Sequence, residues 1–210
     1  MGSCDINMAK LIPILMSRGQ AGRSITAIAG APGSGKSTLA EALVTALNRE
    51  EPGSAAVLPM DGYHYDDLVL NIRGWRARKG APHTFDVAGF AAMLQRLVSN
   101  ADAEIAVPVF DRSLELARAG ARIIAQSVRH VIVEGNYLLL DSAPWAALRP
   151  LYDTTVFLDV PEPQLIARLE TRWAALSPAD RAAKMDGNDL PNVRQVVRES
   201  VAPEFRVTSV

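Results

Sequence analysis

The sequence predicts a three-layer α/β fold with a mostly parallel, five-stranded sheet. Short β-branched runs alternate with segments whose apolar residues recur every three or four positions, which is typical of βαβ units. A glycine-rich loop at residues 30–38 joins one such run to one such helical segment. The 210 residues, 49% hydrophobic and 21% charged, have the size and composition of one globular domain. We therefore expect residues 1–210 to form a single domain.

The predicted elements follow one another along the chain. An amphipathic stretch at 8–18 lies within an N-terminal extension of residues 1–22. Strands are predicted at 25–29, 55–59, 128–134, 154–159 and 205–210 from their runs of β-branched and apolar residues. Helices are predicted at 38–49, 87–99, 143–150, 162–175, 178–185 and 190–199 from their apolar periodicity. Ser177 and Pro178 form the N-cap and first-position pattern of a helix start, and Arg206 makes the last strand the least regular.

Residues 30–38 read Gly-Ala-Pro-Gly-Ser-Gly-Lys-Ser-Thr, which fits the phosphate-binding pattern G-x-x-x-x-G-K-[ST]. Its glycines let the backbone aim N–H groups at phosphates, and the following helix directs its positive end at the same place. Lys36 adds a charge, and Ser37 is the position whose hydroxyl normally binds Mg²⁺. The alternative is a glycine-rich turn that carries a lysine. The predicted nucleotide contacts are Gly30, Ala31, Pro32, Gly33, Ser34, Gly35, Lys36, Ser37 and Thr38.

Acidic residues end or follow three of the predicted strands. Ligands of an open parallel sheet bind beyond the carboxyl ends of its strands, so these residues are candidates for chemistry. Asp61 is placed to act as a base toward a substrate hydroxyl, unless it only starts a turn before Gly62. Glu134 stands where a carboxylate holds Mg²⁺, unless it is a plain strand end. Asp159 is predicted to be structural, as a cap of the next helix.

The segment at residues 61–86 is polar, aromatic and interrupted by glycine and proline, and it is too long for a simple turn. Long loops of this kind usually carry function, so we predict that it is the substrate loop. His83 is a candidate contact within it. Asp86 is either a contact or the N-cap of the following helix. Arg112, in a later loop, is either a contact or half of an internal ion pair.

Arg168 and Arg172 lie four residues apart on a predicted helix and share one of its faces. Phosphoryl transfer spreads negative charge over the equatorial oxygens, and an arginine on a closing segment is the usual counter-charge. We therefore predict that both are catalytic and that residues 168–187 form a small helical lid. The alternative is a solvated basic face interrupted by Glu170.

The composition excludes several classes of function. Twenty-two basic and 23 acidic residues leave a net charge of −1, which disfavours a nucleic-acid partner. The single cysteine, Cys4, forms no internal disulfide, and no Cys/His spacing suits zinc. An apolar run long enough for membrane insertion is missing, so a cytoplasmic location is expected by default. The sequence leaves a homodimer open.

From about residue 25 onward the chain resembles the P-loop kinases grouped with uridine kinase, phosphoribulokinase and type I pantothenate kinase, and in particular bacterial fructose transport system kinases. The segments that carry this resemblance are 30–38, 60–64, 78–86, 108–112, 133–137 and 188–192. The resemblance implies a P-loop NTPase fold, ATP and Mg²⁺ as cofactors, and a small-molecule hydroxyl as phosphoryl acceptor. It also implies that Asn188 and Asn192 lie near the nucleotide base.

The resemblance further implies a division of work among the site residues. Asp61 is the base, Lys36 and Ser37 hold phosphate and Mg²⁺, and Glu134 supports the metal. The predicted substrate contacts are Asp61, Tyr63, His64, Arg78, Lys79, His83, Asp86, Arg112 and Tyr137.

The acceptor stays open between three substrates. A sugar is preferred because of the fructose-related branch. The segment Arg-Lys-Gly-x-Pro is similar to pantothenate kinase, and Pro-Val-Phe-Asp is similar to the Pro-Val-Tyr-Asp of uridine kinase. An alternative of another class is a regulatory NTPase without an acceptor, although the Asn-Lys-x-Asp motif of a GTPase is missing from the sequence.

Overall fold

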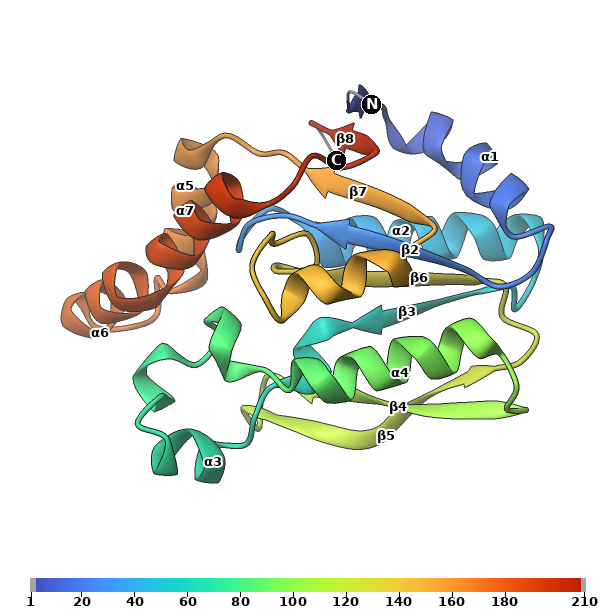
Figure 1. Ribbon diagram of the computed structural model, residues 1–210. Helices are drawn as coiled ribbons and strands as arrows, with labels where there is room; N and C mark the ends of the chain where they lie inside the picture. The colour runs from blue at the N-terminus through green and yellow to red at the C-terminus, as the bar shows by residue number, and fades with distance from the viewer. Residues whose placement is uncertain (1–2, 209–210) are drawn as a thin grey trace.

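A computed structural model of the chain, which describes residues 3–208, has a six-stranded parallel sheet at its centre (Figure 1). The strand order is β1-β8-β7-β2-β6-β3. These strands are β1 (Cys4–Asp5), β2 (Ser24–Ala29), β3 (Ala55–Pro59), β6 (His130–Gly135), β7 (Thr154–Leu158) and β8 (Phe205–Val207). A separate antiparallel hairpin is made of β4 (Glu104–Asp111) and β5 (Leu116–Ala125).

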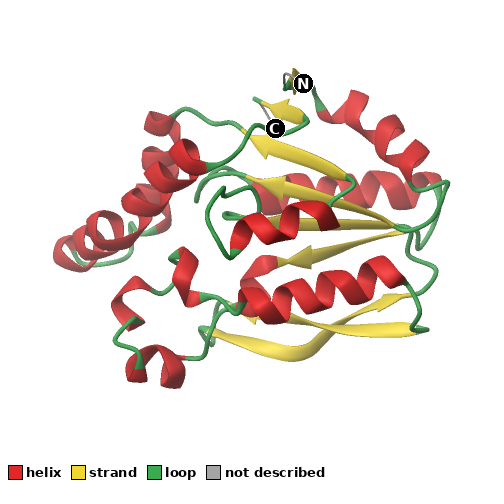
Figure 2. Ribbon diagram, in the orientation of Figure 1, coloured by secondary structure: helices red, strands yellow, loops and turns green. Residues whose placement is uncertain are grey.

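Helices cover both faces of the sheet, which confirms the predicted three layers (Figure 2). Helix α2 lies behind the sheet in the view of Figure 1 and contacts α1, whereas α4 and a 3₁₀ segment, Trp145–Leu151, lie in front. The bounds are α1 (Met8–Arg18), α2 (Lys36–Glu50), α3 (Asp67–Ile72) and α4 (Val87–Ser99). None of the helices within residues 3–208 is long and apolar enough to cross a bilayer.

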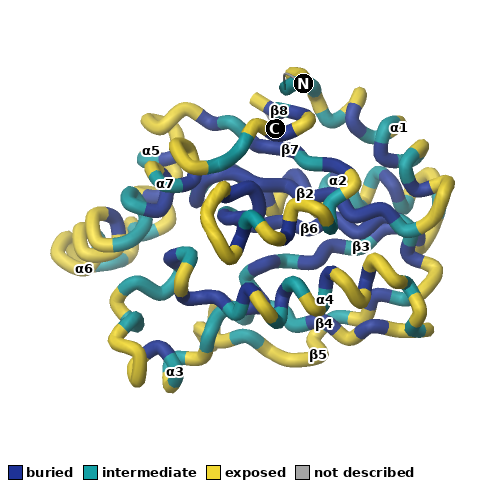
Figure 3. Tube along the Cα trace, in the orientation of Figure 1, coloured by how far each residue is buried: buried dark blue, intermediate teal, exposed yellow. Residues whose placement is uncertain are grey.

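A helical arm projects beyond the carboxyl ends of the strands (Figure 1). It consists of α5 (Glu162–Arg172), α6 (Pro178–Lys184), a π-helical turn (Met185–Asp189) and α7 (Leu190–Glu199). We call residues 185–192, which join α6 to α7, the lid root. Helix α6 buries none of its residues (Figure 3). This exposure fits a segment that covers a site rather than one that builds the core.

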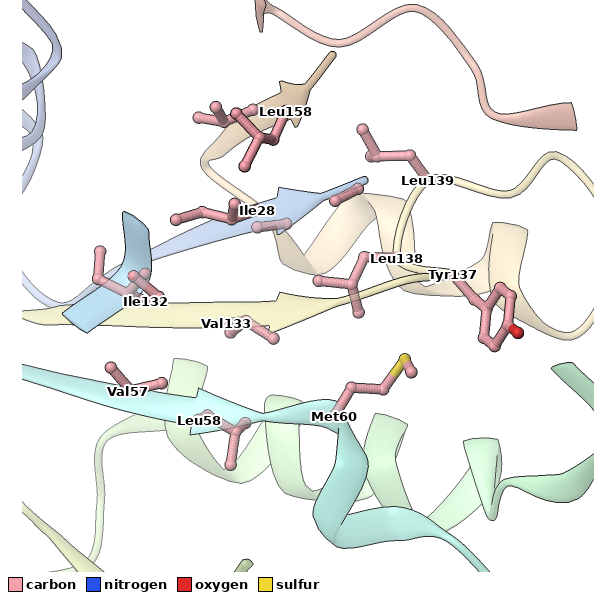
Figure 4. Packing of buried hydrophobic residues seen from close by; sticks show 14 of the residues in the cluster. Ile28, Val57, Leu58, Met60, Ile132, Val133, Tyr137, Leu138, Leu139 and Leu158 are labelled. Carbon is pink, nitrogen blue, oxygen red and sulfur yellow. The ribbon is translucent and has the colours of Figure 1, made fainter. Parts of the chain in front are cut away.

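The core lies between the sheet and its covering helices. Every residue of β2 and β6 is buried, as expected for central parallel strands that are covered on both faces. Figure 4 shows how side chains of neighbouring strands pack together. Those labelled on strands are Ile28 of β2, Val57 and Leu58 of β3, Ile132 and Val133 of β6, and Leu158 of β7. This packing fixes the strand ends, and with them the residues that follow each strand.

The structure adds three strands to those predicted. Strand β1 has only two residues, both exposed, so no hydrophobic pattern marks it. The hairpin strand β5 is mostly exposed and contains alanine, arginine and glycine, which gives a weak strand signal. Arg122 of β5 donates a hydrogen bond to the carbonyl oxygen of Val57 on β3 at 2.6 Å. The hairpin therefore packs beside the last strand of the main sheet.

Several helix boundaries also differ from the prediction. The helix expected at 143–150 is a 3₁₀ segment at Trp145–Leu151, which contains Pro150. The helix expected at 162–175 ends at Arg172, with Trp173 as its C-cap. The two helices expected at 178–185 and 190–199 are joined by the π-helical turn rather than by a loop.

Strand β8 completes the sheet despite its arginine. Phe205 and Val207 are buried, whereas Arg206 points to the opposite face with a side chain that is 40% exposed. Its guanidinium donates to the Asp159 carboxylate at 2.7 Å. Asp159 is therefore structural, as predicted, but it forms an ion pair instead of capping α5, whose N-cap is Pro161. The predicted end of this strand at 209–210 lies outside the described residues.

Buried His130 predicts that stability depends on pH. Burial lowers the pKa of this imidazole, and the charge of Arg129 acts in the same direction. Below the unfolded pKa of about 6.5 the unfolded chain binds a proton that the folded chain rejects. We expect the free energy of unfolding to fall as pH drops from 7 to 5, and His130→Gln to flatten this fall. Urea unfolding at several pH values measures it, and an unchanged slope in the variant would contradict the prediction.

Candidate active site

The phosphate-binding loop connects the end of β2 to the first turn of α2. Gly33 and Gly35 have φ angles of 81° and 99°, a region that favours glycine. A Cβ on Gly30 would lie 2.9 Å from the carbonyl oxygen of Leu158, so this position needs close backbone approach. Gly35 is the N-cap of α2 and provides no side-chain cap, which leaves the first N–H groups of the helix to bind an anion.

Lys36 extends from the first turn of α2 into the site. The residue is only 8% exposed, and its ammonium donates to Asn136 Oδ1 at 2.6 Å and to the carbonyl oxygen of Ala31 at 3.2 Å. Burial lowers the pKa of the ammonium, and the nearby carboxylates of Glu134 and Asp61 oppose this effect. A nearby anion strongly stabilises a cation that is held this way, because water solvates the buried charge poorly.

Glu134 and Asp61 lie close together because β6 pairs with β3. Glu134 is in register with Pro59, the last residue of β3, and Asp61 follows two residues later. Glu134 is 7% exposed. Burial raises the pKa of its carboxyl group, the charge of Asp61 adds to this rise, and Lys36 opposes it. Two carboxylates thus meet beside the lysine, as the strand-end argument predicted.

The Asp61 carboxylate forms an ion pair with Arg112. Arg112 donates from Nη2 to Asp61 Oδ2 at 3.0 Å and is itself 70% exposed at its side chain. Within the described part of the chain this contact leaves Oδ1 of Asp61 available. Arg112 therefore forms an internal ion pair and also lines the cavity described next, and its contact with a substrate stays a prediction.

A cavity of about 550 Å³ brings most of the predicted site residues together. On the phosphate side it is lined by Pro32, Gly33, Gly35, Lys36, Ser37, Thr38 and Glu134. On the acceptor side it is lined by Asp61, His64, Lys79, Phe85, Phe110 and Arg112. On the lid side it is lined by Arg172, Trp173, Lys184, Asn188, Asp189 and Asn192. One open cavity therefore reaches the phosphate-binding loop, the substrate loop and the lid.

Lys79 is held in the acceptor side of the cavity. Its side chain is 7% exposed and forms an ion pair with Asp67 at 2.7 Å. It also donates to the carbonyl oxygen of Glu115 at 2.6 Å and lies 5.4 Å from the ring centroid of Phe110. These contacts fix α3 and the hairpin tip around one ammonium group. The charge is already compensated, so this lysine shapes the acceptor side without presenting a free cation.

The two predicted catalytic arginines differ in their contacts. Arg168 donates to the carbonyl oxygens of Gly33 and Ser34 at 3.2 and 2.9 Å, so it braces the back of the phosphate-binding loop. Arg172, one turn later, lines the cavity. Both belong to α5, so the segment free to act as a lid starts after residue 172 rather than at 168. A catalytic role for Arg172 stays a prediction.

Five predicted substrate contacts lie outside the cavity lining. Tyr63 packs in the core against Phe90, with ring centroids 4.8 Å apart. Asp86 is the N-cap of α4 and accepts from the Gly89 N–H at 2.9 Å. His83 is exposed, with its ring edge-on to Trp75. Arg78 and Tyr137 bond to other parts of the site instead, as described below. These positions support the alternative that Asp86 has a capping role.

Asn136 and several aromatic residues line the cavity although sequence reasoning missed them. Asn136 accepts from Lys36, and its place directly after the strand-end pair Glu134-Gly135 is the signal that could have identified it. Phe85, Phe110 and Trp173 provide the apolar walls. Aromatic residues are equally common in cores, so no local pattern marks these three as cavity residues.

The donor set fits a magnesium ion that arrives with a nucleotide. Among residues 3–208, no three His, Cys, Asp or Glu side chains are grouped to hold a metal by themselves. Mg²⁺ in phosphoryl-transfer sites needs only one or two protein oxygens, because phosphate oxygens and waters complete its shell. The Ser37 hydroxyl and the buried Glu134 carboxylate line the same cavity and supply such oxygens.

Taken together, the fold and the cavity define a nucleotide-binding enzyme of the P-loop class. No protein-family model matches the chain. "Putative uridine kinase C227.14" of Schizosaccharomyces pombe is 35% identical over 193 residues, which cover 87% of this chain and 82% of that protein. The crystal structure of a "putative fructose transport system kinase" from Silicibacter sp. TM1040 is 39% identical, with a TM-score of 0.85, over 96% of this chain and 98% of that one.

A further relative is a longer protein, of which the match covers about half. Pantothenate kinase of Enterococcus faecalis is 32% identical over 146 residues, which cover 69% of this chain and 47% of that enzyme. The chain belongs to the family of P-loop kinases that includes these uridine kinase-like and pantothenate kinase proteins. It is an ATP-dependent kinase of a small molecule.

Proposed function

We propose that the chain transfers the γ-phosphoryl group of ATP to a hydroxyl of a sugar, with Asp61 as the general base. The observation that carries the proposal is the meeting of Asp61, Glu134 and Lys36 around one cavity. As the acceptor oxygen bonds to the γ-phosphorus, the bond to the β–γ bridging oxygen breaks and ADP leaves. The hydroxyl proton passes to Asp61 Oδ1, because Arg112 already occupies Oδ2.

The remaining residues bind and orient the nucleotide phosphates. The loop N–H groups and Lys36 cradle them, while Ser37 and Glu134 would hold Mg²⁺. When bound, the ion neutralises charge on the β- and γ-phosphate oxygens. Arg172 lines the lid side of the cavity, which supports a contact with the transferred group. Rate enhancement on this account comes from positioning and charge, since the protein forms no covalent bond with the phosphoryl group.

His64 supports an acceptor with a second hydroxyl. Its Nδ1 lies 2.8 Å from the Asp61 carbonyl oxygen, which can only accept, so Nδ1 carries the proton. Burial lowers the pKa of the ring, so it is neutral and its Nε2 is an acceptor. The ring is tilted against Phe85 and Phe110, with centroids 4.0 and 4.8 Å away. A sugar offers both a hydroxyl for Nε2 and C–H faces for these aromatic walls.

An acceptor screen tests the proposed function directly. ATP consumption would be measured with fructose, other sugars, pantothenate, uridine and ribulose 5-phosphate. We expect consumption to rise with a sugar in proportion to the amount added. A response to pantothenate or uridine alone would replace the sugar with that acceptor. Consumption that ignores every acceptor would instead favour a regulatory NTPase.

A substitution of His64 tests its part in acceptor binding. His64→Phe keeps an aromatic ring near Phe85 and Phe110 but removes the Nε2 acceptor, together with the Nδ1–H bond to the Asp61 carbonyl oxygen. We expect the KM for the acceptor to rise about tenfold, the size of one net hydrogen bond, while the KM for ATP stays unchanged. Steady-state kinetics with each substrate varied in turn measures both. An equal rise in both KM values would point to a general disturbance of the site.

A further inference from the structure

The lid root is hydrogen-bonded to the substrate loop. Asn188 donates from Nδ2 to the carbonyl oxygen of Lys79 at 2.9 Å. Asn192 donates from Nδ2 to the carbonyl oxygen of Gly80 at 3.4 Å, and its Oδ1 accepts from Arg78 at 3.2 Å. Three consecutive residues of the substrate loop are thus held by two amide side chains of one helical segment.

The sequence produces this contact through its local geometry. Asn188 and Asn192 are four residues apart, so they lie on one face, and Asn192 Nδ2 is 3.2 Å from Asn188 Oδ1. Asn192 is only 2% exposed, and a buried amide is costly unless its donors and acceptors are paired. Gly80, with a φ of 101°, turns the loop backbone toward the two amides. The Gly80 carbonyl oxygen accepts a second bond from the Tyr137 hydroxyl, at 2.5 Å.

Each side of this contact also faces the cavity. On the substrate loop, the Lys79 side chain lines the acceptor side. On the lid, Trp173 and Asp189 line the opposite wall and bond to each other at 2.7 Å. The π-helical turn itself carries Asn188 and Asp189, and such turns are common at functional sites. A shift of the lid root therefore moves the backbone that positions Lys79.

We propose that Asn188 and Asn192 are positioning residues that join the lid and the substrate loop into one moving unit. Binding of the nucleotide beneath the lid then orders the acceptor side before the acceptor enters. By linkage, the acceptor strengthens nucleotide binding by the same factor, which for coupled sites is typically about 5- to 150-fold. The inference rests on the nucleotide site of the proposed function, but it needs no knowledge of the acceptor.

Hydrogen exchange with a non-hydrolysable ATP analogue and Mg²⁺ tests the coupling in the full chain. In the unmodified protein we expect the analogue to slow exchange at residues 30–38 and also at 76–84, where Ala81 and Thr84 donate backbone hydrogen bonds. In a double variant, Asn188→Ala with Asn192→Ala, we expect slowing at 30–38 only. At residues 76–84 the analogue should therefore slow exchange about tenfold or more in the unmodified protein, within the coupling range above, and this slowing should be lost in the double variant.

Two further variants keep the test decisive. Gln195→Ala removes an amide side chain from the same helix. The hydrogen bond of that amide goes to Glu199 and not to the substrate loop, so this variant should show the same exchange pattern as the unmodified protein. Asn188→Ala combined with Asn192→Asp keeps the volume at position 192 and the acceptor for Arg78 but loses the donors to Lys79 and Gly80, and it replaces the double alanine variant if that one does not fold. Slowing at 76–84 that persists in a folded variant would overturn the inference. The inference would also be overturned if the analogue slowed exchange at 30–38 but not at 76–84 in the unmodified protein. If the analogue did not slow exchange at 30–38 at all, the proposed function would be overturned as well.

Discussion

Asp61→Asn is expected to lower kcat by a factor of about 10²–10⁴ while the affinity for ATP stays the same. The amide matches the carboxylate in shape but cannot take the proton from the acceptor hydroxyl. The ion pair with Arg112 is also lost, yet that arginine is largely exposed and stays solvated. Steady-state turnover and equilibrium nucleotide binding measure the two quantities separately. Unchanged turnover would remove Asp61 from the role of base.

A matched control for this variant is Asp102→Asn. Asp102 is also paired with an arginine, Arg96, at 2.6 Å, but it lies at the far end of α4 and outside the cavity. Loss of an exposed ion pair costs little stability and should leave turnover as it is. A similar fall in both variants would mean that the loss comes from a changed overall charge and not from the base.

Lys36→Met is expected to lower kcat/KM by a factor of about 10²–10³, the usual cost of losing one preorganised charge contact to the transition state. The same variant should unfold at a temperature no lower than the unmodified protein in the absence of nucleotide. Burial lowers the pKa of Lys36, which means that the folded protein holds this charge at a cost. Methionine has a similar length and removes that cost.

The combination of lost activity and retained stability is the decisive result. Lys10→Met serves as the control, because Lys10 is an exposed lysine on α1. It should leave both kcat/KM and the unfolding temperature unchanged. If Lys36→Met instead unfolds much earlier, the hydrogen bond from Lys36 to Asn136 is structural, and the lost activity would not report on phosphate binding.

The sequence predicted those parts of the site that follow from local order along the chain. The phosphate-binding loop is contiguous, Asp61 follows the end of β3, and Glu134 lies at the end of β6, so their meeting needs only parallel pairing of these two strands. The contact of Asn192 with Gly80 joins residues 112 positions apart, and no local pattern records it. The contacts of Arg168 with the loop carbonyl oxygens are likewise invisible to local pattern, and its catalytic role stays a prediction.

The hairpin β4–β5 escaped prediction because its outer strand is exposed and its residues alternate irregularly. Its inner strand buries Ile105 and Val107, but two buried residues are a weak signal without knowledge of the sheet they cover. Strand β1 escaped prediction for a similar reason. Its two residues are exposed, and they form a strand only because they pair with β8. Short strands of this kind depend on their neighbours rather than on their own propensity.

The hydrogen bond from Arg122 to the carbonyl oxygen of Val57 has a consequence for association between chains. An uncovered outer strand offers its backbone to any other extended chain and so promotes aggregation. Here the hairpin lies along that strand and occupies one of its carbonyl groups. The same hairpin carries Phe110 into the acceptor side of the cavity. The hairpin therefore both covers the β3 edge of the sheet and builds a wall of the acceptor site, so its removal should cost solubility and acceptor binding together.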